Sequence, residues 1–146
     1  MTKMKKLMIS LGIAAILLTG LIVSIPFVND YSARCVEKQL LEIPLPENTA
    51  VVESLSKASK LVGNGNGMQY FGAILVQSDL SLDELLIHYQ TALPGAVVKQ
   101  QTTQQIECIE HGSVSFDTAI NGGDYYIVYY FGSGIKPFSE LDVRGH

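Results

Sequence analysis

The most apolar stretch of the chain lies near its start, where residues 7–28 carry no charged side chain. Three lysines, Lys3, Lys5 and Lys6, precede this stretch. A helix rises about 1.5 Å per residue, so the run from Leu7 to Ile25 would extend about 28 Å. The hydrocarbon core of a bilayer is about 30 Å thick. The pattern therefore predicts a transmembrane helix over residues 7–28, behind a short basic tip.

This segment could be a retained anchor, a cleaved signal peptide or a buried core helix. A signal peptide usually has an apolar core of roughly 7–15 residues followed by small side chains at the cleavage site. The run here is longer, and the bulky Tyr31 occupies a position where a small residue is needed. These observations favour a retained anchor that contacts the lipid bilayer through residues 7–28.

The distribution of charge around the segment predicts its orientation. Positive charge precedes it, whereas Asp30, Arg34, Glu37 and Lys38 after it balance one another. Because the basic flank of a membrane helix stays in the cytoplasm, we expect the N-terminus inside. The rest of the chain would then lie on the export side of the cytoplasmic membrane, in a single-pass protein.

After the apolar segment, residues 29–46 lack a helix breaker until Pro44 and Pro46. They could continue the helix beyond the membrane as a short stalk. Residues 47–146 would then form one exported domain, since this length suits a single modest core.

Alternation and turn residues predict a β-hairpin at the start of this domain. Strands are expected at 50–62 and 68–78, joined by the sequence GNGNG at 63–67. The same glycines could in principle cradle a phosphate, but such a loop must lead into a helix N-terminus. Here a strand is expected next, so a turn is favoured.

The clearest helix signal follows at residues 81–93, where Ser81 and Glu84 have capping-box spacing and leucines recur on one face. Further strands are expected at 96–103, at 113–120 and at 125–132, with 105–110 as a strand continuation or an edge. The last two would form a second hairpin around the turn at 121–124. The order predicts an α+β fold: a small antiparallel sheet with this helix packed on one face.

Net charge narrows the choice of partners. Residues 36–146 contain six basic and thirteen acidic side chains. Nucleic acids require clustered lysine and arginine, so we expect no nucleic-acid partner. The same balance argues against the domain lying on anionic lipid.

The sequence offers two cysteines that could form a disulfide and one polar cluster that could bind a metal. Cys35 and Cys108 would both lie on the export side, where a disulfide between them could persist, or they could be two unrelated thiols. Glu107, Glu110 and His111 are weak candidates for a metal site. They match no strong zinc spacing, and along a strand they would point to different faces, so we expect no metal.

The sequence contains no catalytic motif that we can identify. G-x-S-x-G and H-E-x-x-H are absent, and His88 falls off the apolar stripe of its helix. We therefore expect neither an enzyme nor a cofactor. The most unusual composition is YYIVYYFG at 125–132, where Tyr126, Val128 and Tyr130 would share one strand face. This face could be a partner surface, or it could be packed like the other.

The chain resembles a group of small, N-terminally anchored exported proteins of Gram-positive bacteria that have no assigned activity. The resemblance rests on four segments: the apolar helix, IPLPENTAVVES (43–54), GNGNGMQYFGAILVQSDLSLDELLIHYQ (63–90) and GSGIKPFSELDVRGH (132–146). The resemblance implies anchoring and export but no chemistry. The sequence thus favours a non-enzymatic accessory or binding module for an envelope or membrane partner. A small-ligand or metal sensor is the alternative, and a small envelope hydrolase ranks below it.

Overall fold

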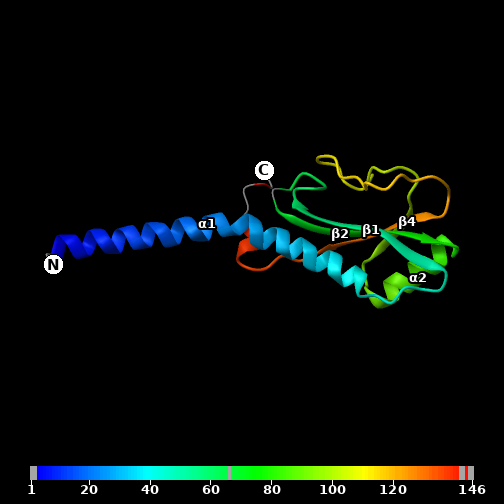
Figure 1. Cartoon of the computed structure of the whole chain (residues 1–146), viewed down its shortest axis with the longest axis horizontal. Coiled ribbons are helices and arrows are strands. Elements are labelled where there is room, and N and C mark those ends of the chain that lie inside the picture. The colour runs from blue at the N-terminus through cyan, green and yellow to red at the C-terminus, as the bar shows by residue number, and fades with distance from the viewer. Residues whose placement is uncertain (1–2, 66, 142–143, 145–146) are drawn as a thin grey trace.

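The structure is a computed structural model that describes residues 3–65, 67–141 and 144. These residues form a long helix, a four-stranded sheet, a second helix and a short 3-10 helix (Figure 1). The elements are α1 (Lys3–Leu41), β1 (Thr49–Ser59), β2 (Gln69–Ser78), α2 (Leu82–Ala92), β3 (Val97–Gln100), β4 (Tyr125–Gly132) and η1 (Phe138–Glu140). The predicted α+β class with an antiparallel sheet is confirmed.

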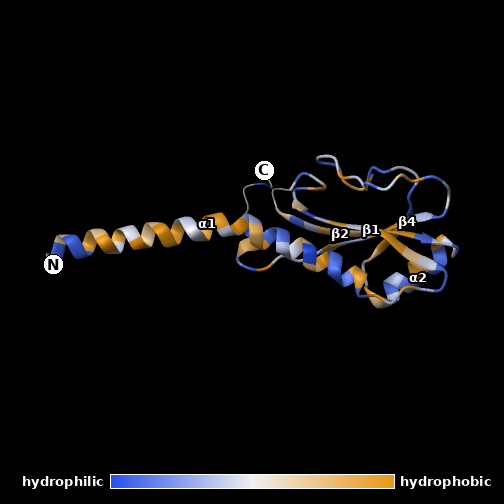
Figure 2. Cartoon of the chain, in the orientation of Figure 1, coloured by the Kyte–Doolittle hydropathy of each residue, from blue (hydrophilic) through white to orange (hydrophobic). Residues whose placement is uncertain are grey.

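The two halves of α1 have different surroundings. Every residue from Lys3 to Val23 is exposed, including all the large apolar side chains. Figure 1 shows this half projecting from the domain, and Figure 2 shows that most of its residues are hydrophobic. By length and composition α1 is long and apolar enough to cross a membrane. It passes through Pro26 as one helix of 39 residues.

The second half of α1 packs on the sheet, which corrects the prediction of a stalk over residues 29–46. Its buried residues recur every three or four positions and form one stripe: Ile25, Asn29, Ser32, Ala33, Val36 and Leu40. Beside the stripe, the hydroxyl of Ser54 in β1 donates to the Glu37 carboxylate over 2.6 Å. The exposed apolar helix therefore continues without a break into the core of the domain.

The sheet has the strand order β1-β2-β4-β3, and each neighbouring pair is antiparallel. β1 and β2 form the predicted hairpin, with Ser54 opposite Ile74. In the next pair Ile74 lies opposite Val128, so β2 and β4 occupy the centre. This position explains why β2 is buried along almost its whole length.

The predicted second hairpin is wrong. β4 pairs with β2 on one side and with β3 on the other, so neither of its edges is free for residues 113–120. Those residues form instead one isolated bridge, from Ser115 to Gln105. The segment 101–124 leaves β3 and covers the face of the sheet opposite α1 before it enters β4.

Each face of the sheet therefore has its own core. On one face, Ile74, Val76 and Val128 pack beneath α1 and α2. On the other face, the buried side chains of the segment 101–124 pack against the strands; the cluster contains Leu61, Phe71, Ala73, Leu75, Ile106, Ile109, Phe116, Ile127 and Tyr129. The expected single covered face becomes two, because the irregular segment takes the place of a second layer.

α2 begins at the predicted capping box. The backbone N–H of Glu84 donates to the Ser81 hydroxyl, and the Glu84 carboxylate accepts the Ser81 backbone N–H over 2.9 Å. The Ser81 hydroxyl also donates to the Glu84 carboxylate over 2.6 Å. This bond, followed by the one from the Ser81 backbone N–H, lowers the pKa of Glu84. Leu85 and Tyr89 are the buried side chains of the helix, which positions α2 over the end of the sheet where α1 terminates.

One carboxylate fastens the irregular segment to the sheet. Glu53 of β1 accepts the backbone N–H groups of Asp117 and Thr118, both over 2.9 Å. Partial burial acts to raise the pKa of Glu53, but these hydrogen bonds outweigh it and the pKa lies below its ordinary value of 4.5. The charged form is therefore bound more tightly in the folded protein than the neutral form.

This geometry predicts a pH-dependent contribution to stability. We expect Glu53→Gln to lower the free energy of unfolding by about 1 kcal/mol at neutral pH. Because the pKa is depressed in the fold, the contribution is present above the unfolded pKa and disappears as the pH falls through the folded one. Thermal unfolding of the full chain in detergent, at about pH 7 and about pH 3, measures it. Glu47→Gln, at an exposed position, is the control, and equal effects of both changes at neutral pH would contradict the assignment.

Candidate functional site

The polar features of the fold gather at the end of the domain where α1 leaves it, called here the helix-exit end. The Tyr70 hydroxyl donates to the Asn29 side-chain oxygen over 2.6 Å, inside the domain. The Asn29 amide donates to the Phe138 carbonyl over 3.3 Å, and the Ile135 N–H donates to the Ser32 hydroxyl over 3.2 Å. These bonds fasten the segment after β4 against the root of α1.

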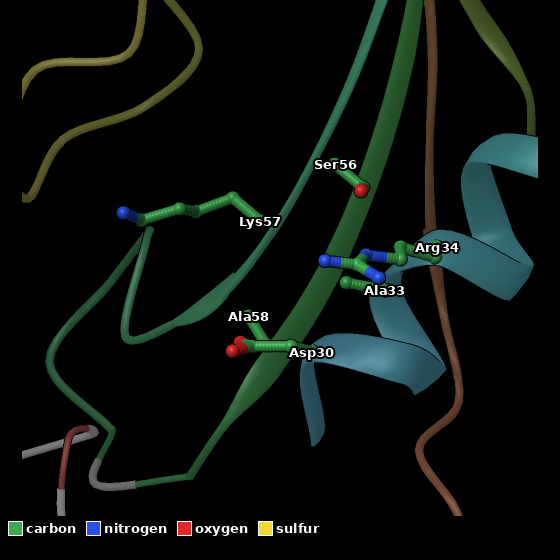
Figure 3. Close-up of a pocket in the computed structure, with 6 residues that line it drawn as sticks. All are labelled: Asp30, Ala33, Arg34, Ser56, Lys57 and Ala58. Atoms are coloured by element: carbon green, nitrogen blue, oxygen red, sulfur yellow. The ribbon is translucent and has the colours of Figure 1, made fainter. Parts of the chain in front are cut away.

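A groove of about 260 Å³ lies beside this root, between α1 and the edge strand β1 (Figure 3). It is lined by Asp30, Ala33, Arg34, Ser56, Lys57 and Ala58. In Figure 3 the Arg34 side chain reaches from α1 across the groove toward β1, whereas the Lys57 side chain points away from the helix. Two of the lining residues have small side chains, Ala33 and Ala58, and both belong to the buried cluster beneath the groove.

The charges in the groove do not cancel. The Asp30 carboxylate is paired with the Arg144 guanidinium over 2.8 Å, and the same guanidinium donates to the Pro26 carbonyl. Among the residues that the structure describes, Arg34 and Lys57 have no ion-pair partner within 4.0 Å. The groove therefore favours an anionic group over a cationic one.

Exposed apolar side chains surround the same end. Phe27 and Tyr31 of α1 are 71% and 58% exposed, and Ile135 and Leu141 of the C-terminal segment are 42% and 51% exposed. The segment that carries the latter two is held against α1 by the hydrogen bonds to Ser32 and Asn29. The helix-exit end thus combines an apolar rim with a cationic groove.

The weak metal candidates serve the fold in other ways. Glu110 accepts the N–H of Gly63 over 2.7 Å, and the His111 ring bonds the Gly63 carbonyl over 2.7 Å. Both side chains thereby tie the segment 101–124 to the β1–β2 turn, while Glu107 is exposed. Over the described residues, no group of three or more His, Cys, Asp or Glu side chains is placed to hold a metal ion.

Of the two alternatives for the cysteines, the structure has the second: Cys35 and Cys108 are free thiols. Cys35 lies on α1, on one face of the sheet, while Cys108 packs against the cluster on the other face. The sheet therefore lies between the two side chains, whereas a disulfide needs Cα atoms within about 7 Å. Burial raises the pKa of the Cys108 thiol, so it has no sign of nucleophilic activation.

The tyrosine face of β4 is packed, which is one of the two arrangements that the sequence allowed, and it is not free as a partner surface. Val128 is fully buried, and Tyr126 and Tyr130 are half-buried against the core beneath α1 and α2. The second half of α1, which was expected to form a stalk, packs beside this face. His88 lies at the rim as expected, and its ring bonds the Pro44 carbonyl over 2.7 Å.

Sequence reasoning missed the groove, although one signal was present. Asn29, Ser32, Val36 and Leu40 repeat at helical spacing, which marks a face that packs on something. Neither family models, nor the curated proteins, nor the solved structures contain a significant match to this chain.

Proposed function

We propose that the protein is a single-pass membrane protein whose α+β domain is held on the export side of the cytoplasmic membrane. The observation that carries the proposal is the exposed first half of α1, which has apolar side chains on every side and no cover within the described residues. A soluble protein does not leave such a surface in water. The three lysines before it support a cytoplasmic N-terminus.

In this position the domain serves as a non-enzymatic accessory or binding module for an envelope or membrane protein. Its end farthest from the apolar helix offers a surface for such a partner. There His88 contacts Pro44, and the chain neighbours of this pair, Ile87 and Leu45, are 68% and 45% exposed. Apolar side chains of this kind dominate the centres of protein interfaces.

Topology is tested first, with single cysteines on the two sides. In a background with Cys35→Ala and Cys108→Ala, we expect a membrane-impermeant maleimide to label Ile87→Cys in intact cells. Met4→Cys should react only after lysis, because it would lie in the cytoplasm. Both positions are exposed, so labelling reports sidedness rather than burial. The reverse pattern, or labelling of both in intact cells, would overturn the proposal.

Partner binding is tested by cross-linking the tagged full-length protein in its own membranes. We expect a stoichiometric partner that is captured by the unaltered chain and lost with Leu45→Ser and Ile87→Ser together. Glu107→Ser with Ser113→Ala, two exposed positions on the segment 101–124, is the control and should retain it. If no partner is captured by any of the three proteins, the accessory role is rejected and the anchoring remains.

A further inference from the structure

We propose that the helix-exit end of the domain is a lipid-docking surface that rests in the headgroup layer of an anionic phospholipid bilayer. The inference rests on the proposed membrane anchoring of α1, and it adds a second lipid contact made by the folded domain. It is carried by the gathering of exposed apolar and basic side chains from distant parts of the sequence around the root of α1.

The apolar rim is continuous with the exposed surface of the helix. Phe27 and Tyr31 extend the apolar surface of α1 toward the domain, and Ile135 and Leu141 extend it sideways onto the C-terminal segment. The hydrogen bonds between this segment and α1 fix that position, so the four side chains are held around the root of α1. Aromatic side chains with a polar tip, such as Tyr31, favour the boundary between hydrocarbon and headgroups.

Basic side chains are concentrated at the same end. Of the described residues after position 28, those at the helix-exit end that carry positive charge are Arg34, Lys57, Lys60, Lys136 and Arg144. The described acidic residues there are Asp30, Glu37, Glu110 and Glu140. Asp30 is paired with Arg144, Glu37 accepts the Ser54 hydroxyl and Glu110 accepts the Gly63 N–H.

The opposite end is acidic, which orients the domain. Glu42 and Glu47 follow the end of α1, and Asp79 and Asp124 flank the far ends of β2 and β4. The net negative charge of the domain argued against contact with anionic lipid. That charge is unevenly distributed, because the acidic side chains gather at the far end and the basic ones at the helix-exit end. An anionic surface attracts basic groups within about one Debye length, so only the near end decides the interaction.

The groove lies at the depth of the headgroups. If Phe27 marks the edge of the hydrocarbon, the helix from Leu7 to Phe27 spans about 31 Å, which matches the core thickness. Asp30 and Arg34 then lie about 4.5 Å and about 10.5 Å beyond that edge. The headgroup layer on each side is about 5–8 Å thick, so the lower part of the groove is within it.

Arg34 supplies the chemistry that recognises a phosphate. A guanidinium donates two parallel hydrogen bonds to phosphate oxygens, which a lysine cannot do. It reaches across the groove beside the Ser56 hydroxyl, which can donate to a further oxygen (Figure 3). The groove would thus take the phosphate of an anionic phospholipid whose acyl chains run along the exposed part of α1.

A tryptophan reporter tests the docking, because the chain contains no tryptophan of its own. Leu141→Trp is placed in the full-length protein, which is then reconstituted in nanodiscs of anionic phospholipid brominated near the carbonyl end of the acyl chains. We expect blue-shifted and quenched fluorescence for Leu141→Trp. Leu45→Trp, equally exposed at the far end, should be neither shifted nor quenched. Equal emission from both positions would overturn the proposal.

Headgroup selectivity is measured on the same reporter. Quenching by brominated anionic lipid is compared with quenching by brominated zwitterionic lipid, which gives a relative association constant. Each basic group near an anionic surface contributes about fivefold, so Lys60→Gln with Lys136→Gln should reduce the preference by up to about 30-fold at low salt. Lys38→Gln with Lys99→Gln removes the same charge away from this end and should leave it unchanged. Arg34→Gln should reduce the preference on its own, because it removes the phosphate donor.

A second reporter separates this inference from the anchoring on which it rests. Leu17→Trp lies in the middle of the exposed half of α1 and should be quenched by lipid brominated deep in the acyl chains. If Leu17→Trp is quenched and Leu141→Trp is not, the helix is inserted and the docking surface is refuted. If neither is quenched, the anchoring itself fails.

Discussion

Leu40→Ala is expected to lower the free energy of unfolding of the domain by about 3 kcal/mol, within the usual range for a buried leucine. Leu40 is 1% exposed and packs with Ile43, Ile74 and Leu85, so its truncation leaves a cavity between α1, the sheet and α2. The measurement is thermal unfolding of the full-length protein in detergent, followed by the near-ultraviolet circular dichroism of its tyrosines.

The neighbouring residue is a matched control. Leu41 is 46% exposed, so Leu41→Ala removes the same atoms from a site that faces solvent and should change stability by less than about 0.5 kcal/mol. A stalk would make the two substitutions equivalent, since neither side chain would have a packing partner. Equal, small effects would therefore restore the stalk and remove the second half of α1 from the core.

The elements with local signals could be predicted from the sequence. The capping box of Ser81 and Glu84 located α2 to within a residue at each end, because its hydrogen bonds form between residues three apart. The turn at 63–67 located the β1–β2 hairpin for the same reason. The apolar run of residues 7–28 likewise defined the exposed half of α1, since its composition is independent of tertiary contacts.

The errors arose where a pairing between distant residues decides the structure. Residues 113–120 have strand-like alternation, but β3 and β2 occupy both edges of β4, and no local pattern reveals this competition. The segment then satisfies its backbone through Glu53, which is more than sixty residues away in sequence. Long-range contacts of this kind do not produce a periodic pattern of residues in the sequence.

The candidate site was hidden by the same limitation. Net charge is a property of the sequence, whereas the separation of basic and acidic ends depends on which way each strand runs. The groove is lined in part by two alanines, Ala33 and Ala58, that attract no attention until the helix and strand are placed together. The packing of the tyrosine face of β4 is also a long-range contact, since the helix that covers it lies about ninety residues earlier in the sequence.

The backbone of α1 lies very close to the sheet at Gly72 of β2. A Cβ atom at this position would lie 2.7 Å from the Glu37 Cα atom and 2.8 Å from the Val36 carbonyl carbon, and it would also meet the Glu37 backbone nitrogen. Such separations are below van der Waals contact, and backbone atoms cannot move aside as the end of a flexible side chain can. Glycine is thus required here by space, since the helix backbone rests directly on the strand.

Gly72→Ala is therefore expected to push α1 away from β2 and to lower the free energy of unfolding by about 3 kcal/mol, the upper range for overpacking. Hydrogen exchange should show lost amide protection in residues 33–40 of α1, while the exposed apolar half, if it is held in lipid, keeps its own. Gly65→Ala, in the β1–β2 turn with nothing within 4 Å of an added Cβ, is the control and should be nearly neutral. If Gly72→Ala were as mild as this control, the helix would not be seated on the sheet, and the continuous connection between the apolar segment and the domain would be lost with it.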